Sequence, residues 1–206
     1  MLKIWGRMSS INVKKVVWTA QELALDIQRT EAGGLFGVVK TPEYMALNPN
    51  SLVPVIEDGD YTLWESNVIV RYLCKKHSHG TMYPTELREQ FDAEQWMDWQ
   101  QTTLNPASRA GFWQLVRTPV EQRNPAVIAE SNDAVEALMA MLDVHLAGRS
   151  FMVGERFTMA DIPIACEIHR WFGLPQQRQS RPHIERWYSQ IRARQASQGV
   201  LDMLLS

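Results

Sequence analysis

Ser9, Ser10 and Asn12 stand where a short apolar segment gives way to helical periodicity. The first backbone N–H groups of a helix are unpaired and the helix dipole is positive there, so a hydroxyl or an amide at this point favours an anion. Helix capping is the competing interpretation, because Ser and Asn are also preferred N-cap residues. The segment by itself therefore allows either an anion site or a simple helix cap.

Val53 and Pro54 carry a second signal. Pro54 stands at the head of an apolar run with strand character. A cis peptide bond before it would leave the N–H and C=O groups of Val53 unpaired at a sheet edge. Those two groups suit hydrogen bonds to an extended peptide. A plain turn that enters an edge strand is the alternative interpretation of this segment.

Glu65 and Ser66 form a third signal at the start of another helical pattern. The Ser66 hydroxyl and the N–H groups of the first turn can hold a carboxylate, while the Glu65 carboxylate can receive an ammonium group. An amino-acid zwitterion requires both partners. A capped surface helix explains either residue alone, but the adjacent pair beside Pro54 favours a binding site.

Periodicity predicts that these segments belong to one α/β unit. Short apolar runs and alternation predict strands, and apolar residues three and four positions apart predict helices. In the order βαβαββα, the predicted elements are a strand at residues 2–5, a helix at 13–23, a strand at 26–30, a short helix at 42–47, hairpin strands at 53–57 and 61–64, and a helix from Ser66. The first predicted domain therefore comprises residues 1–76.

Residues 77–87 are polar and contain Gly80 and Pro84, which predicts a linker. Residues 88–206 carry helical stripes and no strand signal, so the second domain is predicted to be all-α. Its predicted helices are one at 86–116 with a possible interruption at Pro106, one opened by Asn124 and Pro125, one capped by Thr158 and Asp161, and one opened by Pro182. Pro163 is expected to tighten or bend the first turn of the helix that Thr158 opens, because it lacks an N–H group.

Composition excludes several classes of function. The chain has 206 residues, 21 basic and 23 acidic, so no diffuse positive field is present for nucleic acid or an anionic membrane. Two cysteines are too few for a disulfide framework, and no secretion signal or long apolar run is found, so we expect a soluble cytoplasmic protein. Cys74, His77 and His79 lack a fourth ligand, so we expect no metal site.

The motifs, taken in order, resemble those of the cytosolic glutathione transferases over nearly the whole chain, in particular the bacterial serine-type branch allied to the theta class. The motifs that carry the resemblance are Ser10 ahead of residues 12–16, Asn48-Pro49 leading to Val53-Pro54, Glu65-Ser66 followed by residues 69–73, the segment 157–162, and Pro182 with Arg186-Trp187. Each motif is weak alone, but the ordered set is specific.

The resemblance implies a thioredoxin-like N-terminal domain, a helical-bundle C-terminal domain, and glutathione as co-substrate in the cleft between them. Family members of the serine type use the residue that matches Ser10 to donate a hydrogen bond to the sulfur. Ser9 is a rival because zeta-like relatives place the serine one position earlier, and Asn12 completes this catalytic segment. Val53 beside a cis Pro54 would pair with the cysteinyl backbone.

The same resemblance implies contacts to both ends of glutathione. Glu65 and Ser66 would hold its γ-glutamyl end, and Lys40 would contact its glycyl carboxylate. A cation near the sulfur would help to ionise the thiol, and the candidates are Arg7, Lys14, Lys40 and Arg109.

Arg109, Phe112 and Trp113 follow Pro106 in the long helix, where the family builds the pocket for the electrophile. Core aromatics with an arginine at the rim are the alternative interpretation. The implied activity is conjugation of glutathione to small hydrophobic electrophiles by a detoxifying homodimer. A peroxidase, dehalogenase or isomerase at the same site, or a non-catalytic scaffold relative, remains an alternative.

Overall fold

The computed structural model describes residues 1–206 and begins with a mixed four-stranded sheet. Strand β1 (Leu2–Trp5) is central and pairs in parallel with β2 (Ile27–Thr30) and antiparallel with β3 (Val55–Asp58), which pairs antiparallel with β4 (Tyr61–Trp64). The order across the sheet is β2-β1-β3-β4. The sheet therefore brings the end of β1 next to the start of β3.

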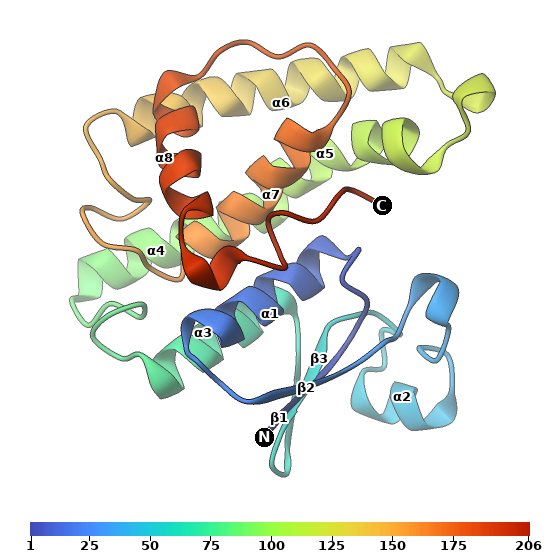
Figure 1. The fold of residues 1–206 in the computed structure, drawn as a ribbon, viewed down its shortest axis with the longest axis vertical. Coiled ribbons are helices and arrows are strands. Elements are labelled where there is room, and N and C mark those ends of the chain that lie inside the picture. The colour runs from blue at the N-terminus through green and yellow to red at the C-terminus, as the bar shows by residue number, and fades with distance from the viewer.

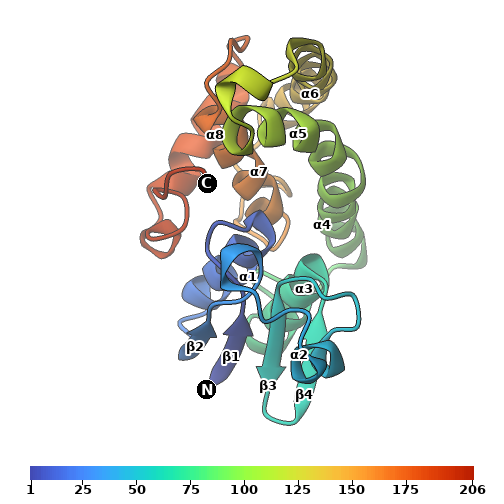
Figure 2. The ribbon, with the colours of Figure 1, turned by 90° about the vertical axis from the view of Figure 1, so that its right-hand side faces the viewer.

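Helices cover both faces of this sheet (Figure 2). Helices α1 (Ile11–Glu22) and α3 (Ser66–His77) lie between the sheet and the rest of the molecule, whereas α2 (Pro42–Leu47) lies on the other side. Alternation along β1 sends Ile4 into the main core, while the neighbouring Trp5 packs edge-on against Tyr44 of α2. The predicted order βαβαββα is confirmed.

The remaining chain is helical (Figure 1). Its α-helices are α4 (Leu87–Trp99), α5 (Asn105–Phe112), α6 (Pro125–Leu146), α7 (Asp161–Gly173) and α8 (Pro182–Arg192). Helix α7 lies at the centre and is buried around nearly its whole circumference, with α1 packed against it. The predicted fold class, an α/β thioredoxin-like domain followed by an all-α domain, is confirmed.

The predicted interruption of the long helix near Pro106 is confirmed, and it consists of a π-helical segment ahead of the proline. A π-helical segment, η2 (Gln100–Leu104), separates α4 from α5, and a second one, η3 (Trp113–Arg117), follows α5. Pro106 is the second residue of α5. A wider turn ahead of the proline fits the absence of its N–H group, and the helical path curves between α4 and α5 (Figure 2).

Helix α7 begins at Asp161 and not at the predicted Thr158. The Asp161 N–H donates to the Thr158 carbonyl, which makes a tight turn just ahead of the helix, and this is the tightening expected around Pro163. Pro163 then falls in the first turn of the helix. The N–H groups of the first turn have no partner within a helix, so the proline removes no helical hydrogen bond.

A single hydrophobic core runs through both parts of the molecule. One cluster of 39 buried residues includes Val16 of α1, Ile69 of α3, Ile164 of α7 and Trp187 of α8. The α/β part and the helical part therefore share an interior and hold each other in place. None of the helices combines the length and apolar character needed to cross a bilayer.

Candidate active site

Ser10 is the N-cap residue of α1, but its side chain caps nothing. Its backbone is extended, with φ −87° and ψ 122°, and its hydroxyl makes no hydrogen bond to the first turn. The Ser10 N–H donates to the Arg7 carbonyl, so the loop itself orders the residue. The interpretation of Ser10 as a side-chain helix cap is therefore wrong, and the hydroxyl is left for another partner.

Ser10 opens into a cavity of about 330 Å³ between the two parts of the molecule. The residues that line it come from the loop after β1, the start of α1, the segment before β3, and the helices α5 and α7 with the π-helical segments. They are Arg7, Ser9, Ser10, Ile11, Asn12, Leu52, Val53, Gln101, Asn105, Arg109, Phe112, Trp113, Arg117 and Arg170. No acidic residue is among them, so the cavity favours an anionic occupant.

Val53 presents its backbone to the same cavity. The peptide bond between Val53 and Pro54 is cis, and neither the N–H nor the C=O of Val53 forms a backbone hydrogen bond. The preceding carbonyl, that of Leu52, is held by the Tyr44 hydroxyl at 2.8 Å and the Asn48 amide at 2.9 Å. Burial raises the pKa of Tyr44 to about 12, so its hydroxyl remains a donor. Tyr44 and Asn48 thus fix the loop through Leu52, while the N–H and C=O groups of Val53 stay unpaired.

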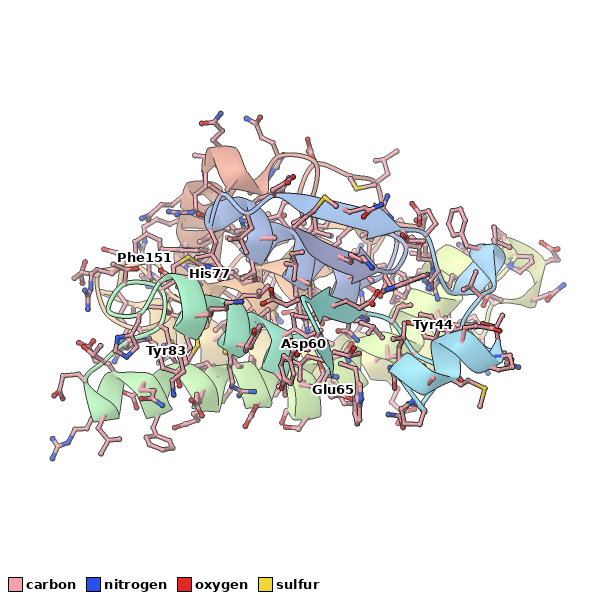
Figure 3. The ribbon with its side chains drawn as sticks, turned by 90° about the horizontal axis from the view of Figure 1, so that it is seen from below. Tyr44, Asp60, Glu65, His77, Tyr83 and Phe151 are labelled. Atoms are coloured by element: carbon pink, nitrogen blue, oxygen red, sulfur yellow. The ribbon has the colours of Figure 1, made fainter.

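Glu65 and Ser66 lie at the same end of the sheet as Val53, where β3 begins and β4 ends. The register pairs Val55 with Trp64, so the residues before Val55 adjoin those after Trp64. Glu65, labelled in Figure 3, has a positive φ of 74° and an exposed carboxylate. A positive φ is uncommon for a residue with a side chain and is concentrated at functional sites. Ser66 is buried and begins α3.

The opposite wall of the cavity is aromatic and basic. Phe112 is buried, whereas Trp113 is 48% exposed. The Arg117 guanidinium lies over both rings, 4.8 Å from the centre of Trp113 and 5.1 Å from that of Phe112. The Arg170 guanidinium carbon lies 4.4 Å from the centre of the Phe112 ring. The alternative in which these aromatic side chains are only core residues therefore fails for Trp113, which is half-exposed, and Phe112, although buried, also lines the cavity.

Known proteins are similar to this chain in both sequence and architecture. Residues 1–75 match the family model of the glutathione S-transferase N-terminal domain, and residues 97–195 match that of the C-terminal domain. The chain belongs to the glutathione S-transferase family. It is 40% identical to glutathione S-transferase GstB of Escherichia coli over 203 residues, which cover 98% of each chain.

A solved structure of the family superposes over the whole chain. The theta class glutathione S-transferase of Xanthomonas axonopodis pv. citri, crystallised with glutathione bound, matches with a TM-score of 0.96 and 40% identity, covering 100% of this chain and 99% of that one. Elongation factor 1-gamma 1 of rice is 32% identical to 72% of the present chain, which corresponds to 36% of its own length. The resemblance to the glutathione transferases is confirmed.

A buried polar network supports the cavity of this glutathione S-transferase from below. The Lys15 ammonium is fully buried and donates to Asn67, Gln100 and Gln101 at 2.8 to 3.1 Å. The Gln100 amide donates in turn to Glu167 at 3.0 Å. Burial lowers the pKa of Lys15 to about 8, because no carboxylate contacts it directly. Sequence patterns do not reveal this network, because its members come from four separate elements.

Some predicted residues of the transferase lie outside the cavity. Lys40 is exposed in the loop before α2, and Lys14 lines a separate small hollow with Cys166 and His169. Pro54, Glu65 and Ser66 lie beside the lining residue Val53, where β3 begins and β4 ends, but they do not line the cavity themselves. Arg7 and Arg109 are therefore the two predicted cations that face the cavity.

Sequence reasoning missed a row of lining residues on one side of the long helix. Every fourth residue from Gln101 to Arg117 lines the cavity, namely Gln101, Asn105, Arg109, Trp113 and Arg117. An ordinary α-helix has 3.6 residues per turn, so a strict spacing of four would drift around it. The two π-helical segments contain wider turns and offset this drift. The spacing of four from Arg109 was the signal that could have found Arg117.

Proposed function

We propose that this glutathione S-transferase binds glutathione in the cavity between its two parts and ionises the thiol beside Ser10. The observation that carries the proposal is the free Ser10 hydroxyl, set at the N-terminus of α1 in a cavity that has no acidic lining residue. A thiolate there meets a hydrogen-bond donor, the positive end of a helix and nearby guanidinium groups.

In the proposed binding mode, each of the three residues of glutathione has contacts of its own. The unpaired N–H and C=O of Val53 pair with the cysteinyl backbone, which puts the sulfur near Ser10. The Ser66 hydroxyl and the first turn of α3 hold the γ-glutamyl carboxylate, and the Glu65 carboxylate holds its ammonium group. Lys40, at the exposed end of the loop before α2, contacts the glycyl carboxylate.

The expected free-energy contributions of these groups are large enough to ionise the thiol. Lowering a thiol pKa by about two units from about 8.5 requires about 2.7 kcal/mol of preference for the anion. A helix N-terminus contributes about 0.3–1 kcal/mol and a hydrogen bond to a charged group about 1.5–3 kcal/mol. Together with one guanidinium group, these contributions cover the requirement. The Asn12 amide, which also lines the cavity, is an additional donor to the sulfur.

The thiolate attacks an electrophile held against Phe112 and Trp113. A C–S bond forms while a halide leaves with its bonding electron pair, or the thiolate adds to an activated double bond and water supplies the proton. Trp113 offers the exposed apolar surface on which a small hydrophobic substrate rests. Such conjugation serves detoxification.

Two alternatives keep the same fold. The same thiolate could reduce a peroxide, dehalogenate a substrate or catalyse an isomerisation. The pocket around Trp113 decides which of these substrates binds, so the fold does not distinguish among the reactions. A scaffold role is favoured only by the similarity to elongation factor 1-gamma. The free Ser10 hydroxyl in a basic cavity favours the enzyme, since a scaffold has no use for it.

We also infer a homodimer in the cytoplasm. The elements β4, α3 and α4 lie on one side of the molecule (Figure 2). They carry exposed apolar side chains, namely Tyr61, Trp64, Val68, Leu87 and Phe91. A monomer seldom leaves such a set in water. Both cysteines, Cys74 and Cys166, are buried and free, which fits a reducing compartment.

Replacement of Ser10 tests the proposal. Ser10→Ala removes the donor to the sulfur, so kcat/KM should fall about tenfold or more and the pKa of the bound thiol should rise, as followed by its ultraviolet thiolate absorbance. Ser9→Ala is the matched control, because Ser9 lines the same cavity one residue earlier. Loss of activity in Ser9→Ala alone would move the role to Ser9. A wild-type protein that binds no glutathione would overturn the proposal.

A further inference from the structure

The cavity contains more positive charge than a glutathione thiolate needs. Four arginines line it, Arg7, Arg109, Arg117 and Arg170, without any acidic neighbour in the lining. Arg170 is paired with Glu167 at 3.1 Å. The other three take part in none of the ion pairs of the chain. Three positive charges are therefore uncompensated by the protein.

The arginines are close enough to repel one another. The pKa of Arg117 is lowered, first by burial and then by the positive charges of Arg7, Arg170 and Arg109. Such a cluster costs free energy in the empty protein and gains it when anions bind. The proposed thiolate supplies one negative charge, which leaves the cluster incompletely neutralised.

Arg7 belongs to the side of the cavity on which glutathione is placed. Its side chain lies against Gly33 and Gly34, where a Cβ atom on Gly34 would lie 2.8 Å from the Arg7 Nε atom. Gly34 also has a φ of 59°, so both the close approach of Arg7 and the backbone conformation require a glycine there. Arg7 is thus held near the loop that leads to Lys40, and we count it with the groups that meet glutathione. Arg109 and Arg117 remain on the opposite wall.

Arg109 and Arg117 flank Trp113 at intervals of four residues along the same side of the helix. Arg117 is ordered by stacking on Trp113 and Phe112, and the one hydrogen bond of its guanidinium goes to the main-chain oxygen of Ser206 at 3.3 Å. Arg109 makes no ion pair and also faces a neighbouring hollow of about 420 Å³. The N–H groups of Arg109 and the remaining N–H groups of Arg117 are therefore available to a planar anion.

We propose that the electrophile of this enzyme carries a carboxylate, which binds between Arg109 and Arg117 while its apolar body rests on Trp113. The inference rests on the proposed function and narrows its substrate class from hydrophobic electrophiles in general to acidic ones. Two guanidinium groups on either side of an exposed indole match a small aromatic or unsaturated acid. A neutral substrate of the same shape would leave both guanidinium groups without an anionic partner.

A matched pair of substrates tests the inference. Chloronitrobenzoate and chloronitrobenzamide differ in one group, which is an anionic carboxylate in the first and a neutral carboxamide of similar shape in the second. With each, the thiolate forms a C–S bond while chloride leaves with the bonding pair. Dividing each kcat/KM by the rate constant of the uncatalysed reaction with glutathione removes the difference in intrinsic reactivity. The wild-type enzyme should favour the acid about tenfold or more.

The variants identify the residues. Arg117→Gln should lower kcat/KM for the acid about tenfold, with the amide changed by less than about threefold. Arg109→Gln should lower kcat/KM for the acid by a larger factor than for the amide. Arg88→Gln is the matched control, because Arg88 is exposed on α4 and makes no ion pair. Equal use of acid and amide by the wild type, or equal losses on both substrates in the variants, would overturn the inference.

Direct binding separates this inference from the proposed function. The quenching of tryptophan fluorescence by nitrobenzoate and by nitrobenzamide is measured on the free protein and on protein saturated with S-methylglutathione. Tighter binding of the acid by about tenfold, lost in Arg117→Gln, supports the carboxylate site even if turnover is slow. A protein that binds both alike while forming a glutathione thiolate refutes only the acidic substrate, whereas a protein that binds no glutathione refutes the proposed function.

Discussion

At the scale of single residues, the site is defined by polar groups that the fold leaves without partners. The Ser10 hydroxyl caps nothing, and the Asn12 side-chain oxygen is buried without a hydrogen bond. A buried polar atom without a partner costs about 1–3 kcal/mol, so it is seldom retained in the absence of a ligand. Rotation of the Asn12 amide can present its NH₂ group to an anion in the cavity.

Asn12→Asp tests the effect of charge at this position. The shape is retained, but a carboxylate repels the thiolate, so the pKa of the bound thiol should rise by about one unit or more and kcat/KM at neutral pH should fall about tenfold. Ultraviolet titration and steady-state kinetics measure the two effects. Asn132→Asp is the matched control, because Asn132 also has a buried oxygen without a partner but lies on α6. Equal behaviour of the two variants would exclude a role for Asn12.

At the scale of elements, the start of α7 is held by one carboxylate. Asp161 accepts hydrogen bonds from the backbone N–H groups of Met152 and Thr158 at 2.9 and 2.8 Å and from the Trp187 indole at 2.9 Å. It thus ties the loop after α6 and the middle of α8 to the first residue of α7. Helix α7 carries Glu167 and Arg170, so this junction also positions the floor of the cavity.

Asp161→Ala should lower the free energy of unfolding by about 3 kcal/mol. The substitution leaves two backbone N–H groups and the Trp187 indole buried without an acceptor. Urea denaturation followed by circular dichroism gives the value. Asp133→Ala provides the comparison, because Asp133 is exposed on α6 and makes no ion pair, and it should change stability by less than about 0.5 kcal/mol. A similar small change in Asp161→Ala would contradict this account.

At the scale of the whole molecule, the two parts are joined by apolar and by polar contacts. The shared core includes Trp18 of α1, which packs against Phe157 near α7. Arg194 donates to both oxygens of Glu22 at 2.7 Å, which joins the chain after α8 to α1. Lys15 adds a buried cation between α1, α3 and η2. Both parts are therefore expected to unfold in one cooperative transition.

Lys15→Met should reveal the cost and the benefit of that buried cation. At neutral pH the variant should be less stable by about 2 kcal/mol, because three amide oxygens lose their donor. In the wild type, the folded pKa of about 8 lies below the ordinary value of 10.5, so between these pH values the unfolded chain binds more protons. The stability of the wild type should therefore rise relative to that of the variant as the pH increases from about 8 to about 10.5.

Urea denaturation over this pH range measures the difference between the two proteins. Lys75→Met, at the exposed end of α3, is the control and should show no such trend relative to the wild type. A difference between wild type and Lys15→Met that stays constant over the range would show that the Lys15 ammonium does not titrate there.

The amino-acid sequence alone determined what depends on neighbouring residues. Apolar spacing located the strands and helices, the Asn124 side chain caps α6 as predicted, and the Thr158 N–H donates to the Asp161 carboxylate as the predicted cap requires. These features follow from interactions within a few residues, which a local pattern records. The ordered motifs also identified the family.

Only the tertiary structure decided what depends on convergence of distant segments. Arg7, Arg117 and Arg170 meet in one cavity although they stand far apart in the sequence, and Lys15 finds its acceptors on α3 and η2. Nothing in the local sequence distinguishes an arginine that faces this cavity from one on a solvated helix surface. The side-chain environment arises from packing of whole elements, so the charge of the cavity and the burial of Lys15 became visible only in three dimensions.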